Sequence, residues 1–225
     1  MQKLLQNYTV QLNKALFTKD PATSDIGKEI LKHGVLLLHE EGLEAFTFKK
    51  LAQAMDSTET TIYRYFQNKH QLLMYICSFY WSQLEWKMAF ATANIECPAT
   101  KLDKALKVLV QTCNQTDGWI NEKILQRVVS AESGKVFDAH HASTDDLKGY
   151  YSAYHSLVDR LAEILLLNNP TLKSSHGLAT AIVDTAHREL FYYFYYPKMN
   201  DAVKNQQSMV QLLQLLTQAI RSHGN

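Results

Sequence analysis

Hydroxyl-bearing and basic side chains are concentrated in one stretch of the chain, between Thr47 and Lys69. A hydroxyl donates a hydrogen bond to a phosphate oxygen, and an ammonium or guanidinium group neutralises the phosphate charge, so these side chains suit a nucleic-acid backbone. Arg, Glu and Thr side chains also contact base edges in the major groove. The candidate contact residues are Thr47, Thr58, Glu59, Thr60, Thr61, Tyr63, Arg64, Tyr65 and Lys69.

Two short helices and a tight turn are expected to position these side chains. Thr47 can cap a helix over residues 48–55, because a Thr hydroxyl accepts hydrogen bonds from the first free backbone N–H groups of a helix. The cluster Asp56-Ser57-Thr58 favours a turn. Thr58 can then cap a second helix over residues 59–66, and Ala52 lies where the two helices must approach closely.

Longer helices flank this pair. Apolar residues at helical spacing predict a helix that begins at Asp25 and stops at Gly42, and Asn68 can cap a long helix from Lys69 to about Thr92. The order of long helix, short helix, turn and short helix is the helix-turn-helix arrangement. In it, helix 48–55 braces helix 59–66, whose N-terminal residues can enter the major groove of DNA.

The run from Ile30 to Leu72, ILKHGVLLLHEEGLEAFTFKKLAQAMDSTETTIYRYFQNKHQL, resembles the N-terminal domain of the TetR family of transcriptional regulators. The family pattern "TLYxYFxxKxxL" corresponds to Thr61-Ile62-Tyr63-Arg64-Tyr65-Phe66 followed by Lys69 and Leu72, without a gap. Helix one of the family carries "IL", "LF" and "G", which are Ile30-Leu31, Leu37-Leu38 and Gly42 in this chain. Its helix two opens with Thr and contains "IA", here Thr47 and Leu51-Ala52.

The chain departs from this family pattern between Asp56 and Thr60. Asp56-Ser57 stands where the family has Gly-Val in the turn, and Asp tolerates a left-handed backbone better than most residues. Thr60 replaces a Gly that is common in the recognition helix. Glu59 adds a negative charge, which suits the helix dipole and can accept from a cytosine amino group but repels phosphate. The resemblance therefore implies DNA binding without implying which sequence is bound.

Several candidate contact residues also have a purely structural interpretation. Glu59 can be a solvated first-turn residue, Thr58 can serve only as a cap, and Tyr65 can pack against the first helix. Ile62 and Phe66 are expected in the core. For Tyr63 and Lys69 the DNA role is favoured: the Tyr63 hydroxyl would donate to a phosphate and Lys69 would neutralise one.

The composition favours an all-α protein. Among 225 residues there are only 8 Gly and 4 Pro, while 46% of residues are hydrophobic, enough for a substantial core. Net charge is +1, and residues 1–75 hold nine basic against eight acidic residues, so any DNA binding must depend on a few placed cations. We found no signal peptide and no apolar run of membrane-spanning length, which predicts a cytoplasmic protein with reduced Cys77, Cys97 and Cys113.

The expected architecture is a three-helix helix-turn-helix head joined by a long fourth helix to a C-terminal helical bundle. We assign an N-terminal arm to residues 1–24, the DNA-binding domain to 25–75, and an effector-binding and dimerisation domain to 76–225. The arm contains one helix at most. The amphipathic segments expected in the bundle are 99–115, 118–133, 144–168, 175–195 and 201–222.

The resemblance implies a homodimer formed through the last two helices, about 175–222, and a small effector bound in the bundle. Segment 201–222 has an apolar surface too wide for a helix that mostly faces water. The run Phe191-Tyr192-Tyr193-Phe194-Tyr195-Tyr196 points all around its helix, so core packing and a dimer interface both remain open.

Aromatic side chains with polar ends suit an effector pocket, although each is also suited to plain core packing. The candidate pocket residues are Trp86, Trp119, Tyr151, Tyr154 and His187. Residues 76–225 hold 14 basic and 14 acidic residues, so a small apolar or aromatic effector is expected.

The sequence contains no recognisable catalytic or cofactor-binding motif. His140-His141 and the nearby Asp138, Asp145 and Asp146 are interpreted as a solvated loop, not a metal site. We therefore expect no enzyme activity, no metal and no cofactor. Two hypotheses remain: a regulator that binds double-stranded operator DNA, and a helical dimeric interaction protein that keeps the head without specific DNA binding. A helical enzyme is the weakest alternative.

Overall fold

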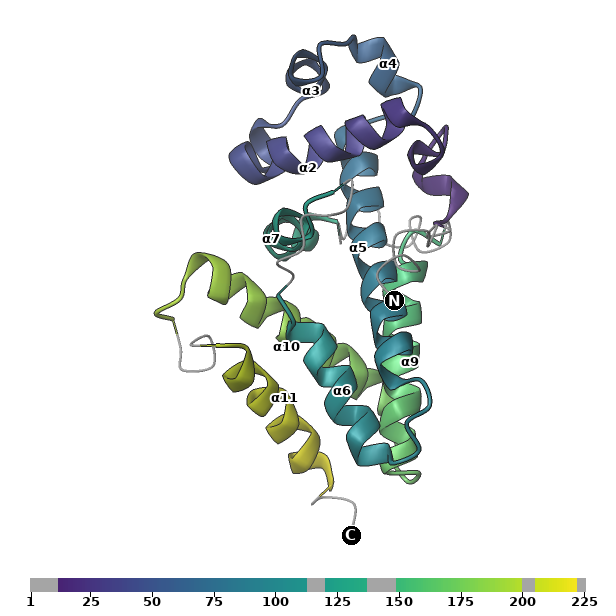
Figure 1. Cartoon of the computed structure of the whole chain (residues 1–225), viewed down its shortest axis with the longest axis vertical. Coiled ribbons are helices and arrows are strands. Elements are labelled where there is room, and N and C mark those ends of the chain that lie inside the picture. The colour runs from purple at the N-terminus through teal and green to yellow at the C-terminus, as the bar shows by residue number, and fades with distance from the viewer. Residues whose placement is uncertain (1–11, 113–119, 137–148, 200–204, 222–225) are drawn as a thin grey trace. The chain divides into compact units, whose positions relative to one another are not determined.

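A computed structural model describes residues 12–112, 120–136, 149–199 and 205–221. The described residues form α-helices and short 3-10 turns, without a strand (Figure 1). The predicted all-α fold is confirmed. The elements are η1 (Lys14–Leu16), η2 (Pro21–Thr23), α2 (Asp25–Ala45), α3 (Phe48–Ala54), α4 (Glu59–Tyr63), α5 (Lys69–Thr92), α6 (Pro98–Val110), α7 (Glu122–Glu132), η3 (Ser133–Lys135), α9 (Ser152–Asn168), α10 (Ser175–Tyr195) and α11 (Gln206–Arg221).

The chain divides into two compact units. The first takes its described residues from Met1–Tyr80 and Cys113–Ala153, and the second from Trp81–Thr112 and Tyr154–Asn225. The long helix α5 contributes residues to both units. Helix α7, expected in the C-terminal bundle, belongs by its contacts to the first unit, where it packs on α2.

Helix α2 begins and ends as local chemistry requires. The Ser24 hydroxyl accepts from the Gly27 N–H at 3.2 Å and caps the first turn. Gly42 adopts a left-handed backbone with φ of 73°, at the position where the sequence predicted the helix to stop. Beyond this kink one further turn continues to Ala45, so the assigned helix is longer than expected.

The helix-turn-helix forms as predicted, with one difference at its end. Thr47 caps α3 by accepting from the Lys50 N–H at 3.2 Å, and Asp56 takes the left-handed conformation in the turn, with φ of 48°. Thr58 caps α4, but the helix ends at Tyr63 and not at Phe66. Asn68 then caps α5, accepting from the Gln71 N–H at 2.8 Å.

Residues 12–24 form two 3-10 turns, η1 and η2, each opened by a side-chain cap from Asn13 or Asp20. Residues 1–11 lie outside the described part. Leu16 is buried, with only 1% of its surface exposed, so this segment contributes to the core of the first unit. The single helix considered for the N-terminal arm is therefore not formed in residues 12–24.

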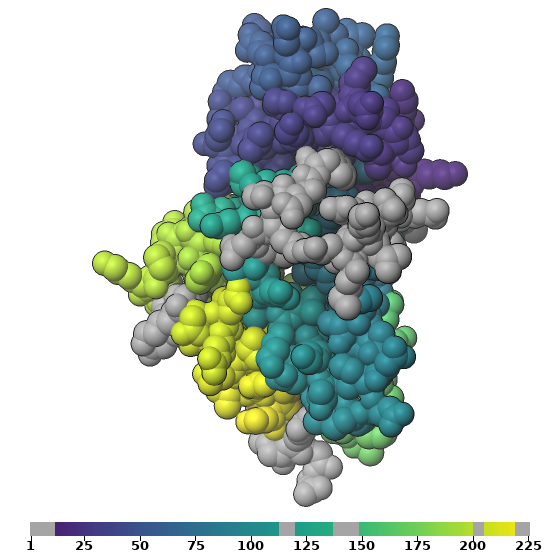
Figure 2. All heavy atoms as spheres, in the orientation of Figure 1, coloured from purple at the N-terminus to yellow at the C-terminus, as the bar shows by residue number. Residues whose placement is uncertain are grey.

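The second unit contains α6, α9, α10 and α11, together with the second half of α5. Helices α6, α10 and α11 contact one another pairwise, and the yellow atoms of α11 lie beside the teal atoms of α6 in Figure 2. The predicted segment 175–195 is confirmed by α10. Helices α6, α9 and α11 are shorter than the predicted segments 99–115, 144–168 and 201–222, part of which lies outside the described residues.

No helix in the described ranges is both long enough and apolar enough to span a membrane.

Candidate nucleic-acid interface

Helix α4 is seated by one buried side chain and leaves its polar residues exposed. Ile62 is completely buried, and Phe66, just after the helix, is equally buried. Both core assignments from the sequence are confirmed. The exposed residues at α4 and its ends are Thr58, Glu59, Thr60, Tyr63 and Arg64. Five of the candidate contact residues are therefore accessible at α4 and its ends.

Two Thr hydroxyls organise the start of α4. The Thr58 hydroxyl accepts from the Thr61 N–H at 3.3 Å and lies 3.1 Å from the Thr61 hydroxyl. The cap aligns the free N–H groups of the first turn, where the helix dipole favours a negative group. Glu59 occupies that first turn. Thr58 is therefore a cap, and its exposure leaves it within reach of a DNA partner as well.

Tyr63 is exposed, but its ring is held by a neighbouring ring. Its side chain is 51% exposed, while its ring packs edge-on against Phe48 of α3, with centroids 5.1 Å apart. Such a contact restricts the ring without consuming the hydroxyl. Thr47, at the start of α3, is also exposed. These positions fit the predicted phosphate contacts of both residues.

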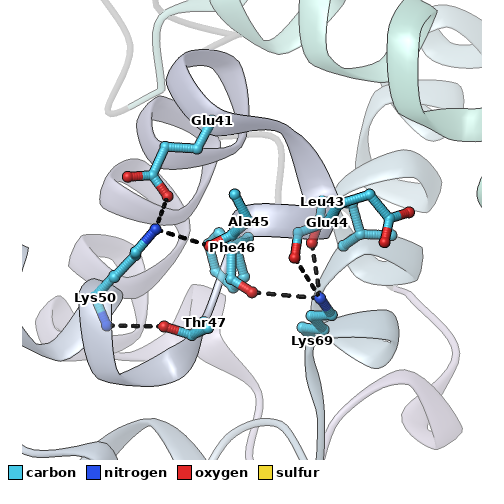
Figure 3. Close-up of polar contacts among 8 residues, drawn as sticks. All are labelled: Glu41, Leu43, Glu44, Ala45, Phe46, Thr47, Lys50 and Lys69. Carbon is cyan, nitrogen blue, oxygen red and sulfur yellow. Dashed lines mark hydrogen bonds and ion pairs between the residues drawn. The ribbon is translucent and has the colours of Figure 1, made fainter.

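Lys69 makes contacts that differ from the sequence prediction (Figure 3). Its ammonium group donates to the backbone oxygens of Leu43, Glu44 and Phe46 at 2.8, 3.2 and 3.4 Å. These carbonyls lie at the end of α2, where helix carbonyls lack partners within the helix and the dipole is negative. Lys69 therefore connects the start of α5 to the end of α2, and its three donors are engaged within the protein.

Lys50 is also engaged within the protein. Its ammonium group lies 2.7 Å from a Glu41 carboxylate oxygen and 3.0 Å from the Ala45 carbonyl oxygen (Figure 3). By contrast, Lys49 and Arg64 are exposed, and no ion pair joins either to another residue of the described ranges. Two of the four cations between residues 45 and 75 thus remain accessible to phosphate.

The burial of Tyr65 favours its structural interpretation over the phosphate contact. It is only 3% exposed, and its hydroxyl lies 2.8 Å from the Ser24 hydroxyl at the start of α2. The hydroxyl thus already shares a hydrogen bond within the protein, in which either oxygen can be the donor. Tyr65 therefore packs against the first helix, the alternative that its position in the sequence had left open.

Comparison with known proteins also identifies the helix-turn-helix region. Residues 30–76 match the family model described as bacterial regulatory proteins, tetR family. The chain carries a TetR-family N-terminal domain. A search of curated proteins gave no match.

Solved structures extend the likeness beyond the TetR domain. A tetR-family regulatory protein from Rhodococcus RHA1 aligns with a TM-score of 0.63 at 14% identity, covering 88% of this chain and 97% of its own. AibR, solved with isovaleryl coenzyme A and operator DNA, gives a TM-score of 0.58 at 16% identity, covering 82% and 97%. The ketosteroid regulator KstR2 of Mycobacterium tuberculosis gives 0.57 at 15%, covering 88% and 95%. At these identities the shared feature is the fold.

Outside the TetR domain, the predicted effector residues are divided between the two units. Tyr151 belongs to the first unit, where it is buried and donates to the Val136 carbonyl oxygen at 3.2 Å. Trp86, Tyr154 and His187 belong to the second unit. Trp119 lies outside the described residues. The effector site remains a prediction.

Within the second unit, these side chains have partners of their own. Tyr154 donates to an Asp184 carboxylate oxygen at 2.7 Å, and burial is the main cause that raises its pKa above the ordinary value. Trp86 stacks on Phe90 with centroids 5.7 Å apart. No group of three His, Cys, Asp or Glu side chains suited to a metal occurs in the described ranges, and His140-His141 falls outside them.

Sequence reasoning missed the residues that hold the TetR domain together over long range. Gln71, Thr18 and Ser24 all contact residues 65–67, yet none stood out by type. The only local signals were the caps Asn13 and Asp20, which indicate turns but not what the turns pack against. Lys49 was counted as charge and not assigned as a contact.

Proposed function

We propose that this protein is a DNA-binding transcriptional regulator that acts as a homodimer, with one copy of α4 in each of two successive major grooves. The observation that carries the proposal is the division of α4 into a buried Ile62 and an exposed polar surface that includes Thr60, Tyr63 and Arg64. Polar side chains on a braced, exposed short helix are what major-groove recognition requires. Repression of a pseudo-palindromic operator is part of the proposal.

Selection of DNA from random duplex pools with the purified full-length protein tests the proposal. Two-fold symmetry predicts an enriched pseudo-palindrome whose half-sites are about 10 base pairs apart, or a multiple of that spacing. The matched control is the double variant Tyr63→Phe and Arg64→Ala, both exposed positions, which should fold normally and enrich nothing or far less. If the wild-type protein enriched no sequence, the proposal would be wrong.

The proposed dimer uses the region of α10 and α11. Met209 and Leu213 of α11 are fully buried within one copy, whereas Leu215 on the same helix is 60% exposed. Tyr196 and Met199, just after α10, are also exposed. A second copy of the chain would cover such apolar side chains. In sedimentation experiments Leu215→Glu should shift the protein towards monomer, while Gln211→Glu, exposed on the same helix, should not.

Release by a small apolar or aromatic effector completes the proposal. AibR, a protein of similar fold, was solved with both isovaleryl coenzyme A and operator DNA, which supports the binding of a small molecule and of DNA by this fold. An effector that lowers DNA affinity must itself bind more weakly in the presence of operator, by the same factor. Calorimetric titration of candidate compounds with and without the selected DNA tests this, and equal affinities in both would contradict release by that compound. The proposed function involves no catalytic step.

One observation favours the second hypothesis, an interaction protein without specific DNA binding. Lys50 and Lys69 are engaged within the TetR domain, and Glu59 adds a negative charge at the start of α4. Both features reduce the positive charge available to phosphate. The same selection experiment separates the hypotheses, because a stable dimer that enriched no DNA would favour this one.

A further inference from the structure

The recognition helix α4 cannot hold its own position. It has five residues, Glu59–Tyr63, and an isolated helix of that length does not form in water. Its first end is fixed by the Thr58 cap and by the preceding turn, where the Ser57 N–H donates to the Ala52 carbonyl oxygen at 2.9 Å. Near its last end, the buried Ile62 and Phe66 give apolar support, and further polar contacts hold the segment that follows.

These polar contacts come from residues 13–19, which we call the N-terminal strap. The Thr18 N–H donates to the Tyr65 carbonyl oxygen at 2.8 Å, two residues after α4 ends. The Lys19 ammonium lies 5.2 Å from the centroid of the Tyr65 ring, a cation–π arrangement. The backbone and the ring of Tyr65 are thus both in contact with the strap.

Gln71 fixes the strap to the segment after α4. Its side-chain amide donates to the Ala15 carbonyl oxygen at 3.0 Å, while its side-chain oxygen accepts from the Gln67 N–H at 2.7 Å. Gln71 is 8% exposed, and both bonds are partly buried. The buried Leu16 and the Phe17 ring, edge-on to Tyr75 at 5.9 Å, add apolar packing at the same place.

The other end of the strap is anchored to the segment that leads into α9. The Asn13 side-chain amide donates to the Gly149 carbonyl oxygen at 2.9 Å, and its side-chain oxygen accepts from the Ala15 N–H at 2.8 Å. Gly149 has a left-handed backbone with φ of +69°, and a Cβ there would lie 2.6 Å from the Asn13 amide nitrogen. The close approach therefore depends on glycine.

We propose that the N-terminal strap is a positioning element for the recognition helix: it holds the last turn of α4 in place and links it to the segment before α9. A displacement of Gly149 would then reach Tyr65 through Asn13 and Thr18. The positioning of α4 by the strap rests on contacts within the first unit alone. Its consequence for operator binding rests on the proposed function.

Amide hydrogen exchange of the DNA-free, full-length protein tests the positioning. The Tyr65 and Phe66 N–H groups both donate to the Ile62 carbonyl oxygen, at 2.9 and 3.0 Å, and report the last turn of α4. The Leu51 N–H, bonded to Thr47 at 3.1 Å, reports α3 as an internal reference. Thr18→Pro removes the donor to Tyr65, whereas Thr18→Ala keeps it and loses only an exposed side chain.

Thr18→Pro should accelerate exchange at Tyr65 and Phe66 about fivefold relative to Leu51, the factor expected for one hydrogen bond, and Thr18→Ala should not. Gln71→Glu is a second, independent variant: it loses the donor to Ala15 but still accepts from Gln67. Asn13→Asp keeps the η1 cap and loses the Gly149 contact, with a smaller effect in the same direction.

Wild-type exchange at Tyr65 and Phe66 in both Thr18→Pro and Gln71→Glu would overturn the proposal. Equal acceleration at Leu51 would also overturn it, because the strap would then stabilise the whole domain without positioning α4. On the selected operator, Thr18→Pro should raise Kd without changing its salt dependence, since no cation is removed. If no operator were selected, the proposed function would fail while the exchange result still decided the role of the strap.

Discussion

The two units of the molecule differ in how well residue types along the chain predict which side chains meet. In the first unit, five of the nine contact residues expected between Thr47 and Lys69 are exposed on α4 and at its ends. In the second, Trp86 and Tyr154 are engaged with Phe90 and Asp184 respectively. The difference follows from spacing: short helices joined by a capped turn fix which residues are neighbours, whereas scattered aromatic residues do not.

A second contrast lies within the TetR domain. Tyr63 and Tyr65 are two residues apart in the same family pattern, yet one is half exposed and the other buried. Arg64 and Lys69 are both cations, yet Arg64 is exposed and Lys69 donates to three carbonyls. Within one motif, some residues therefore hold the domain together, and others are exposed to a binding partner.

The largest expected effect separates the buried and exposed sides of α4. Ile62→Ala should lower the free energy of unfolding by about 3 kcal/mol, because it empties a fully buried site. Thr60→Ala, exposed on the same helix, should change it by less than about 0.5 kcal/mol. Chemical denaturation measures both values. An equal loss of unfolding free energy in the two variants would contradict the assignment of Thr60 to the exposed surface of α4.

The next effect separates the two kinds of lysine. Lys69→Met should lower the free energy of unfolding by about 1 kcal/mol, because the partly exposed ammonium no longer satisfies the carbonyls at the end of α2. Lys49→Met should leave stability unchanged but reduce the slope of log affinity against log salt by about 0.9 for the phosphate it would contact. If Lys69→Met instead reduced the salt slope and left stability unchanged, Lys69 would be the residue that contacts phosphate.

A smaller effect is expected in the second unit. Tyr154→Phe removes the hydroxyl that donates to Asp184 and should lower the free energy of unfolding by about 0.5 to 1 kcal/mol, since the carboxylate is solvent-exposed. DNA affinity should not change. Altered binding of an effector by this variant, measured by calorimetry, would instead assign Tyr154 to an effector site and remove the contrast between the units.

The smallest effect depends on pH and concerns the α2 helix. Burial, followed by the charge of Arg127, lowers the pKa of His39 below its ordinary value of 6.5, and its buried Nδ1 has no hydrogen-bond partner among the described residues. The unfolded chain therefore takes up this proton more readily, so the free energy of unfolding should fall as pH drops through about 6.5. Denaturation at pH 7.5 and 5.5, compared with His39→Gln, should show a flatter dependence in the variant.

The range of each interaction explains what the sequence could predict. The caps Thr47, Thr58 and Asn68 act on residues two or three positions ahead, so their types and spacing sufficed. Tyr65 is held by Ser24 and Thr18, which lie far back in the chain. No local pattern reports such partners.

The same reasoning applies to the end of α4 and to Lys69. The sequence predicted a helix to about Phe66, whereas α4 ends at Tyr63 and the Tyr65 carbonyl oxygen accepts from the Thr18 N–H. Lys69 matches the family pattern at its position, while its carbonyl partners follow from the kink at Gly42. The motif therefore predicted where the site lies, but tertiary contacts determine which of its residues are exposed and which are engaged within the protein.

The affinity of Tyr63→Phe for the selected operator tests the central claim most directly, with Tyr65→Phe as its matched control. If the exposed surface of α4 binds DNA, Tyr63→Phe should weaken binding about fivefold across sequences at unchanged stability, as expected for one lost hydrogen bond. Tyr65→Phe should lower stability by losing the Ser24 contact and leave the affinity of the folded protein unchanged. Wild-type affinity in Tyr63→Phe together with weakened binding in stably folded Tyr65→Phe would contradict the account.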